Sequence, residues 1–95
     1  MIKVVAKKNV NEGEVEKVIK LYEELVRETR KETGCIKYEL YQDEKNINIL
    51  AVIEEWEDKE CLNKHMNSEH FIRIVPMIRE LTSEKSDMNI YNKLI

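Results

Sequence analysis

Residues 47–56 restrict the fold more than any other part of the chain, because they form a strand with two apolar sides. Successive side chains of a strand point to opposite faces. One face carries three apolar residues and one acid: Leu50, Val52, Glu54 and Trp56. The opposite face is apolar at every alternate position: Ile47, Ile49, Ala51 and Ile53. Both faces of this strand therefore have to be covered, whereas a half-buried antiparallel strand leaves one face to water.

Three further segments have the alternating pattern of strands: residues 2–8, 35–42 and 88–95. In the second of these we expect Ile36, Tyr38 and Leu40 to share one face. The hydrophilic residues 43–46 follow it and predict a hairpin turn into the central strand. Residues 82–87 predict a loop before the last strand.

Helical spacing of apolar residues predicts a long helix with one buried face, and then two shorter helices. Asn11, with Glu14 three residues later, has the pattern of a capping box for the long helix, and Gly34 that of its C-terminal cap. Asp58 and Ser68 are expected to cap the other two. The order is the β-α-β-β-α-β pattern of ferredoxin-like folds. We therefore predict an α+β fold, in which an antiparallel four-stranded sheet has its helices on one face.

The open face of this sheet predicts self-association. The chain has 95 residues, which we interpret as a single domain over residues 1–95. The helices cover one face only, and no further element remains for the other. The economical cover is the same sheet of a second copy, packed face to face in an isologous homodimer.

Composition excludes several classes of partner. The net charge is −3 without a basic cluster, so we expect no nucleic acid. An apolar run of about 20 residues, as a membrane span requires, is missing, and the N-terminus does not resemble a signal peptide. Cys35 and Cys61 lack metal-like spacing, so reduced thiols in a cytoplasmic protein are the simple interpretation. A glycine-rich phosphate loop is also missing, which argues against nucleotide and flavin binding by a standard motif.

Three side chains with chemical potential are expected to meet between the sheet and the helices. Glu54 and Trp56 lie two residues apart on one strand and so point the same way. His65 lies on the inner face of the next helix. An imidazole, a carboxylate and an indole in an apolar space are typical of a small-molecule site, where His65 can accept a proton and Glu54 can orient it. Each also has a purely structural interpretation, as a core residue with its hydrogen bonds satisfied.

Four further residues are candidates with weaker patterns. Tyr22 and Tyr38 have apolar neighbours and either line the pocket or pack in the core. His70 lies in the first turn of the last helix, either at the pocket mouth or exposed to solvent. A metal site formed by His65, His70 and Glu69 is disfavoured, because five-residue spacing across a helix break is not a ligand signature. We therefore expect no metal.

The motifs of this region resemble those of a known family. The string runs Glu54-Glu55-Trp56-Glu57-Asp58, followed by Leu62, His65, Ser68, His70 and Phe71. It is similar to the antibiotic biosynthesis monooxygenase family, whose members commonly show Glu-x-Trp at the end of the third strand. In that family a His follows on the next helix, and then a Ser/Thr-x-His-aromatic turn. Gly34-Cys35 with Tyr38 is similar to the opening of the family's second strand. The resemblance covers essentially the whole chain.

This resemblance implies a dimeric α+β barrel. It also implies a monooxygenase without cofactor, metal or flavin, which oxidises a small aromatic, quinol- or anthrone-like substrate with dioxygen. His65 would then be the base or hydrogen-bond partner, Glu54 its orienter and Trp56 the aromatic wall. The haem-degrading branch is disfavoured because residues 74–77 contain no His. Two alternatives stay open: an isomerase of a signalling-sugar metabolite, from which Trp56 leans away, and a non-enzymatic dimeric module that binds a ligand.

Overall fold

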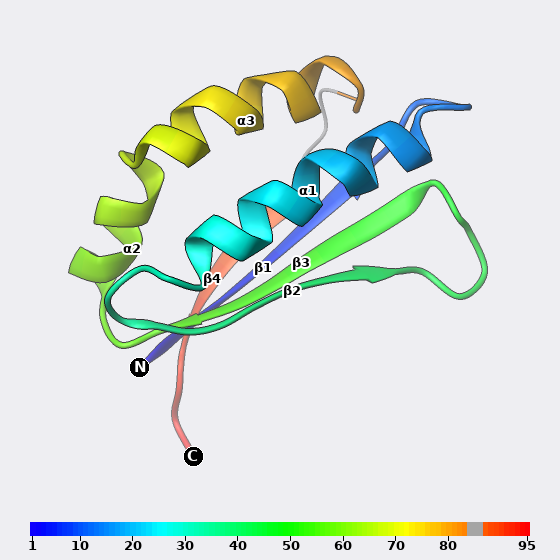
Figure 1. Ribbon diagram of the computed structural model, residues 1–95. Coiled ribbons are helices and arrows are strands. Elements are labelled where there is room, and N and C mark those ends of the chain that lie inside the picture. The colour runs from blue at the N-terminus through cyan, green and yellow to red at the C-terminus, as the bar shows by residue number, and fades with distance from the viewer. Residues whose placement is uncertain (84–86) are drawn as a thin grey trace.

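The computed structural model describes residues 1–83 and 87–95. Its elements follow the predicted order, with two helices before the last strand (Figure 1). They are β1 (Ile2–Asn9), α1 (Val15–Thr29), β2 (Cys35–Gln42), β3 (Ile49–Trp56), α2 (Lys59–Met66), α3 (Glu69–Glu80) and β4 (Asp87–Asn92). The loop expected at residues 82–87 falls partly on residues 84–86, which lie outside the described residues.

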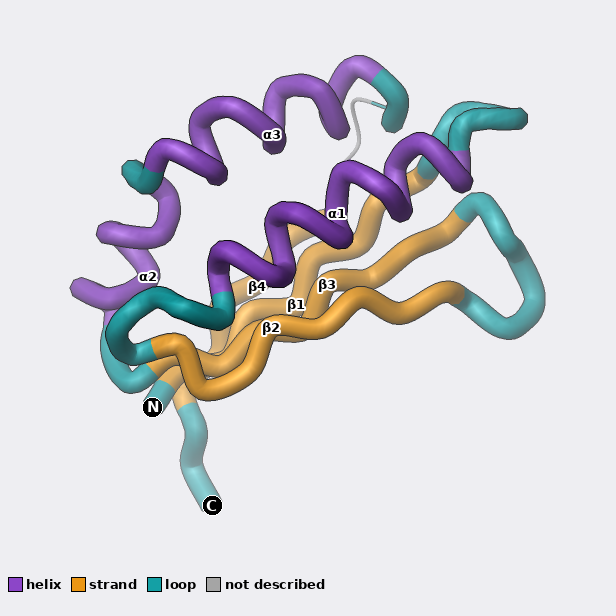
Figure 2. The backbone as a smooth tube through the Cα atoms, in the orientation of Figure 1, coloured by secondary structure: helices purple, strands orange, loops and turns teal. Residues whose placement is uncertain are grey.

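The four strands form one antiparallel sheet in the order β2-β3-β1-β4. The helices lie on one face of this sheet, and the other face carries none of the described elements (Figure 2). The predicted ferredoxin-like α+β fold is therefore confirmed. β3 is a central strand, paired with β2 on one side and β1 on the other. The residue pairs across these strands fix which side chains share a face.

The core lies between the sheet and the helices. In β1 and β3 the residues with even numbers point into it, among them Val4, Leu50 and Val52. The helices supply further buried apolar residues: Val18, Tyr22, Leu25, Leu62, Ile74 and Ile78. β3 is buried at every second position, as its pattern predicted, while Ile49, Ala51 and Ile53 are half-buried on the outer face.

The caps of the two short helices are confirmed, but those of α1 are not. The carboxylate of Asp58 accepts from the Cys61 N–H at 2.8 Å, and the Ser68 hydroxyl accepts from the Phe71 N–H at 3.3 Å. α1 begins at Val15, and its N-cap residue Glu14 makes no side-chain cap hydrogen bond. The Glu14 N–H instead donates to the backbone carbonyl of Asn11, so Asn11 belongs to a turn before the helix. The prediction of a capping box was wrong.

Gly34 has a different role from the predicted helix cap. α1 ends at Thr29, five residues earlier, and Gly34 lies in the turn that leads into β2. Its φ is +84°, a conformation that favours glycine, and a Cβ there would run into the Cys61 side chain. The glycine therefore lets α2 approach the α1–β2 turn closely.

Three strand assignments also differ in detail. A bulge between Cys35 and Lys37 leaves Ile36 half-exposed, so it does not share a face with Tyr38 as predicted. β3 starts at Ile49 rather than at residue 47. The last strand ends at Asn92, and the chain beyond it extends away from the helices (Figure 1). Within the described residues, none of the helices has the length and apolar character needed to cross a membrane.

Candidate functional site

The candidate site forms where β3 ends and α2 begins, under the turn that joins α1 to β2. Glu54 and Trp56 both point from β3 into the core, as predicted, and are 7% and 0% exposed. The sheet register places Glu54 between Val4 of β1 and Tyr38 of β2. His65 of α2 is 1% exposed and lies against the Trp56 ring. The expected meeting of carboxylate, indole and imidazole is therefore present.

Three aromatic rings pack against the imidazole of His65. The Trp56 ring is tilted over it, with ring centroids 4.8 Å apart. Tyr38 and Phe71 contact it edge-on, at centroid distances of 5.3 and 5.1 Å. We call the rings of Trp56, Tyr38 and Phe71 the aromatic cage. The cage holds the imidazole in one orientation and keeps water away from it.

Glu54 is a carboxylic acid in a nearly dry environment. The Trp56 indole N–H donates to one of its carboxylate oxygens at 2.9 Å. Burial raises the pKa of Glu54 to about 7, although the Trp56 hydrogen bond opposes this; the charge of Glu32 raises the pKa further. Glu54 therefore changes its charge near neutral pH, as an acid–base group requires.

The hydrogen-bond partner of His65 is Glu32, not Glu54. The Glu32 carboxylate lies 2.7 Å from His65 Nδ1 and, through the same oxygen, 2.8 Å from His70 Nε2. Glu54 was expected to orient His65, but Glu32 occupies His65 Nδ1, and Glu54 instead accepts a hydrogen bond from the Trp56 indole. Sequence reasoning missed Glu32 entirely, since it lies among charged residues in the turn after α1 and its partners are 33 and 38 residues away.

Glu32 fixes the chemical state of the His65 ring. A carboxylate only accepts hydrogen bonds, so the Nδ1–H of His65 must donate to it, and Nε2 carries the lone pair. Burial lowers the pKa of His65, against the raising effect of the Glu32 hydrogen bond, so the ring is neutral at pH 7. The Nε2 atom is buried and has no hydrogen-bond partner among the described residues. It is a free base that faces the protein interior.

The two tyrosines occupy different places. Tyr38 belongs to the aromatic cage, and burial raises the pKa of its hydroxyl well above the ordinary value. Tyr22 of α1 is 3% exposed, and burial, with the charge of Glu54, raises its pKa as well. Both hydroxyls therefore stay protonated and are available as hydrogen-bond donors.

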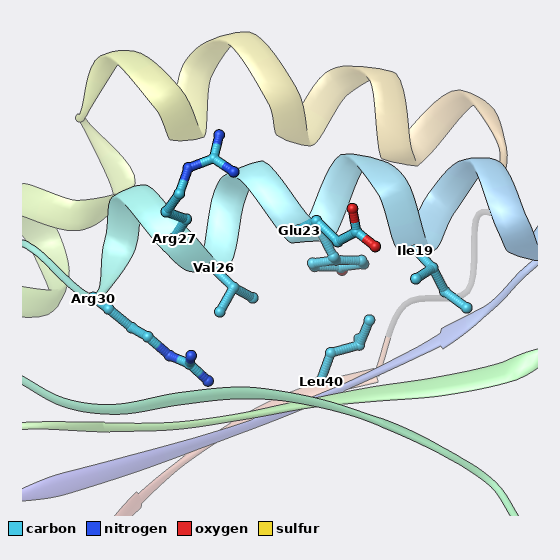
Figure 3. Close-up of a pocket in the computed structure, with 7 residues that line it drawn as sticks. Ile19, Glu23, Val26, Arg27, Arg30 and Leu40 are labelled. Carbon is cyan, nitrogen blue, oxygen red and sulfur yellow. The ribbon is translucent and has the colours of Figure 1, made fainter.

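Tyr22 also lines a cavity of about 420 Å³ between α1 and β2. Ile19 and Val26 point from α1 toward Leu40 of β2 and form its apolar walls (Figure 3). Arg27 and Arg30 are its basic residues. Its volume is in the range of small-molecule sites, which are mostly apolar with few polar groups.

The group that could hold a metal differs from the one considered from sequence. Glu69 pairs with Arg73 at 2.6 Å. The carboxylate that meets both imidazoles is Glu32, and one ligand atom each from Glu32, His65 and His70 lie within 4.8 Å of one another. His70 lies at the mouth of this arrangement, with 15% of its side chain exposed.

Comparisons with known proteins identify the family of the chain and agree with its fold. A family model described as antibiotic biosynthesis monooxygenase matches residues 1–76. The crystal structure of a conserved protein from Methanosarcina mazei Go1 is 41% identical and has a TM-score of 0.95, covering 98% of this chain and 92% of that one. The crystal structure of an antibiotic biosynthesis monooxygenase is 34% identical and has a TM-score of 0.94, with both chains covered completely.

A curated relative, the uncharacterized protein sll1783 of Synechocystis, is 29% identical over 76 residues. The match covers 80% of this chain and 52% of the relative, so the chain spans about half the length of that protein. The family model alone covers well over half of the chain, including β3, α2 and the first part of α3, where the site residues lie. The chain therefore belongs to the antibiotic biosynthesis monooxygenase family.

Proposed function

We propose that this protein oxidises a small, electron-rich aromatic compound, of the quinol or anthrone type, with dioxygen and without a cofactor. The observation that carries the proposal is the unpartnered Nε2 of His65, buried beside Trp56 and set in its basic state by Glu32. A hydroxyl or activated C–H group of the substrate satisfies this lone pair by giving it a proton.

The chemistry follows from that proton transfer. His65 Nε2 takes the proton, and the substrate anion passes one electron to dioxygen. The superoxide and the substrate radical combine to a peroxide anion, which takes the proton back from His65, and the resulting hydroperoxide loses water as its O–O bond breaks. A CH2 group becomes a carbonyl, and one substrate molecule with one dioxygen gives one product and one water. The aromatic cage supports these steps by excluding bulk water, and the protonated Glu54 carboxyl is able to donate a hydrogen bond to the developing oxyanion.

Substrate access follows from the burial of the site. Nε2 is closed to solvent, so the side chains around it have to move before a substrate reaches it. We propose that the substrate first binds in the cavity that Tyr22 lines between α1 and β2, because its apolar walls suit an aromatic ring. We assign substrate binding to Tyr22, Tyr38, Trp56 and His70, and the proton-transfer roles to His65 and Glu54.

Oxygen consumption tests this proposal. Purified protein is supplied with a panel of quinols and anthrones, with and without a chelator. We expect turnover that the chelator does not reduce, and a kcat lower by about 100-fold or more in His65→Gln and Glu32→Gln, as for loss of a general base. Glu69→Gln is the control, because Glu69 is an exposed acid next to His70 whose side-chain hydrogen bonds, among the described residues, go to Arg73. Circular dichroism confirms the fold of each variant. Absence of oxygen uptake across the panel, or full activity of a folded His65→Gln variant, refutes the proposal.

We also propose that two copies pack through the outer face of the sheet. This face carries Val5, Ile49, Ala51 and Ile53 in a continuous apolar row, and the helices are all on the other side. In sedimentation experiments we expect the wild type to be a dimer and Ile53→Glu a monomer. Ile72→Glu, at an exposed isoleucine of α3, should remain dimeric. A monomeric wild type contradicts the proposal.

The two free cysteines support a place in the cytoplasm.

A further inference from the structure

Three side chains of metal-ligand type converge at the outer edge of the aromatic cage. Glu32 comes from the turn after α1, His65 from α2 and His70 from the first turn of α3. His65 Nδ1 and His70 Nε2 both point at one oxygen of Glu32, at 2.7 and 2.8 Å. All three ligand atoms lie within 4.8 Å of one another. Residues that are far apart in the sequence thus offer two nitrogens and one oxygen to the same point.

The spacing is close to that of a bound ion. Metal bonds of about 2.0–2.2 Å to nitrogen and oxygen place neighbouring ligand atoms roughly 3–3.5 Å apart. The Glu32 oxygen is a few tenths of an ångström too close to each nitrogen, because it now accepts hydrogen bonds from both. A small rotation of the Glu32 carboxylate opens this space, and 16% of that side chain is exposed. The same exposure provides the path by which an ion enters.

The donor set selects the kind of ion. Two imidazoles and one carboxylate suit zinc and its neighbours among the divalent first-row metals, whereas calcium and magnesium prefer oxygen ligands only. Three protein ligands leave at least one coordination position open to water or to a ligand. The carboxylate of Glu32 also compensates one of the two positive charges of a divalent ion.

The ligands are already held in place. The cage fixes the ring of His65, and the Ser68 hydroxyl donates to the His65 carbonyl at 2.7 Å. The Glu32 backbone N–H donates to the Thr29 carbonyl, and its carbonyl accepts from the Cys35 N–H. Little conformational freedom is lost when an ion binds to such a site.

We propose that Glu32, His65 Nδ1 and His70 Nε2 form a binding site for a divalent first-row transition-metal ion of the zinc type. The ion replaces the two ring protons that now point at Glu32. On His65 this proton then resides on Nε2, so the nitrogen that was a free base becomes a donor. Metal binding and proton abstraction by His65 therefore exclude each other, and the ion inhibits any reaction that uses this base. The binding itself is independent of turnover.

Cobalt(II) absorption tests the site without reference to activity. Chelator-treated protein is titrated with Co2+ and its visible d–d bands are followed, and Zn2+ is then added in competition. We expect one equivalent of Co2+, displaced by one equivalent of Zn2+. Glu32→Gln and His70→Gln should weaken binding by at least about 100-fold, since even loss of an outer partner of a ligand weakens metal affinity by about 10–100-fold. Both positions are partly exposed, so these variants keep the core intact. Glu69→Gln, next to His70 but paired with Arg73, should bind as the wild type does.

Three results overturn the proposal. The first is the absence of stoichiometric d–d bands in the wild type. The second is unchanged Co2+ affinity in both ligand variants. The third is strong sulfur-to-cobalt charge transfer, which places the ion on Cys35 or Cys61 instead. Oxygen consumption has no part in these readouts, so a failure of the proposed oxygenase activity leaves the metal result standing, and the reverse also holds.

Discussion

Glu54→Gln should stabilise the protein at alkaline pH. Burial raises the pKa of Glu54 from 4.5 to about 7, so above pH 7 the fold has to hold an ionised carboxylate in a dry environment. Each pKa unit corresponds to about 1.4 kcal/mol, so the raised pKa of Glu54 lowers the stability of the wild type by roughly 3 kcal/mol when the carboxylate is ionised. Glutamine has the same shape and its carbonyl still accepts from the Trp56 indole, but it carries no charge.

The sign of the effect follows from proton binding. Between pH 4.5 and about 7 the folded protein holds a proton on Glu54 that the unfolded chain has released, so stability falls as pH rises. Below pH 4.5 both states are protonated and the effect vanishes; above pH 7 it is complete. From pH 5 to pH 8 the wild type should therefore lose roughly 2.5 kcal/mol relative to the variant.

Urea unfolding at pH 5, 6, 7 and 8 measures this difference, at one fixed protein concentration because association also contributes to stability. The lowered pKa of His65 gives a slope of the opposite sign, but it is present in both proteins and cancels in the comparison. Glu55→Gln, on the outer face of β3, shows what the loss of a carboxylate does outside the site. A stability difference between wild type and Glu54→Gln that stays constant from pH 5 to 8 would refute the reasoning.

Two further predictions use urea unfolding as well. Trp56→Phe keeps an aromatic ring but removes the N–H that donates to Glu54, so we expect the free energy of unfolding to fall by about 1–3 kcal/mol. The loss should be larger at pH 8 than at pH 5, because the hydrogen bond favours the ionised carboxylate. Equal losses at the two pH values would contradict this. Gly34→Ala should be more destabilising than Gly13→Ala by about 1–3 kcal/mol. Both glycines have positive φ, but of the two only Gly34 places the new Cβ against a side chain, that of Cys61. Similar losses in the two variants would show that this close approach is unimportant.

Local periodicity was sufficient to predict most of the fold. The alternation of β3 placed Glu54 and Trp56 on the inner face, and the helical spacing of α2 placed His65 there as well. These positions depend only on a residue's own element and on which side is apolar. The bulge at Ile36 could not be predicted in this way, because it depends on how β2 pairs with β3 rather than on β2 alone.

Glu32 could not be found from the sequence for a related physical reason. Its neighbours Lys31 and Thr33 are polar, so by pattern it belongs to a solvated turn. It acts in the site only because that turn folds back over α2, a contact that no periodicity encodes. The weak signal that existed was Gly34, whose positive φ marks a tight reversal of the chain two residues later.

Two short connections explain why the site forms at this end of the sheet. After Trp56 the chain turns through Asp58 into α2, a helix of eight residues, so His65 stays within stacking distance of the strand it has just left. From the other side, the Glu57 N–H donates to the Gly34 carbonyl at 2.9 Å, and the missing side chain of Gly34 admits Cys61. This contact brings the α1–β2 turn against α2 and thereby places the Glu32 carboxylate on the imidazole. The tautomer of His65 thus depends on a glycine two residues after Glu32.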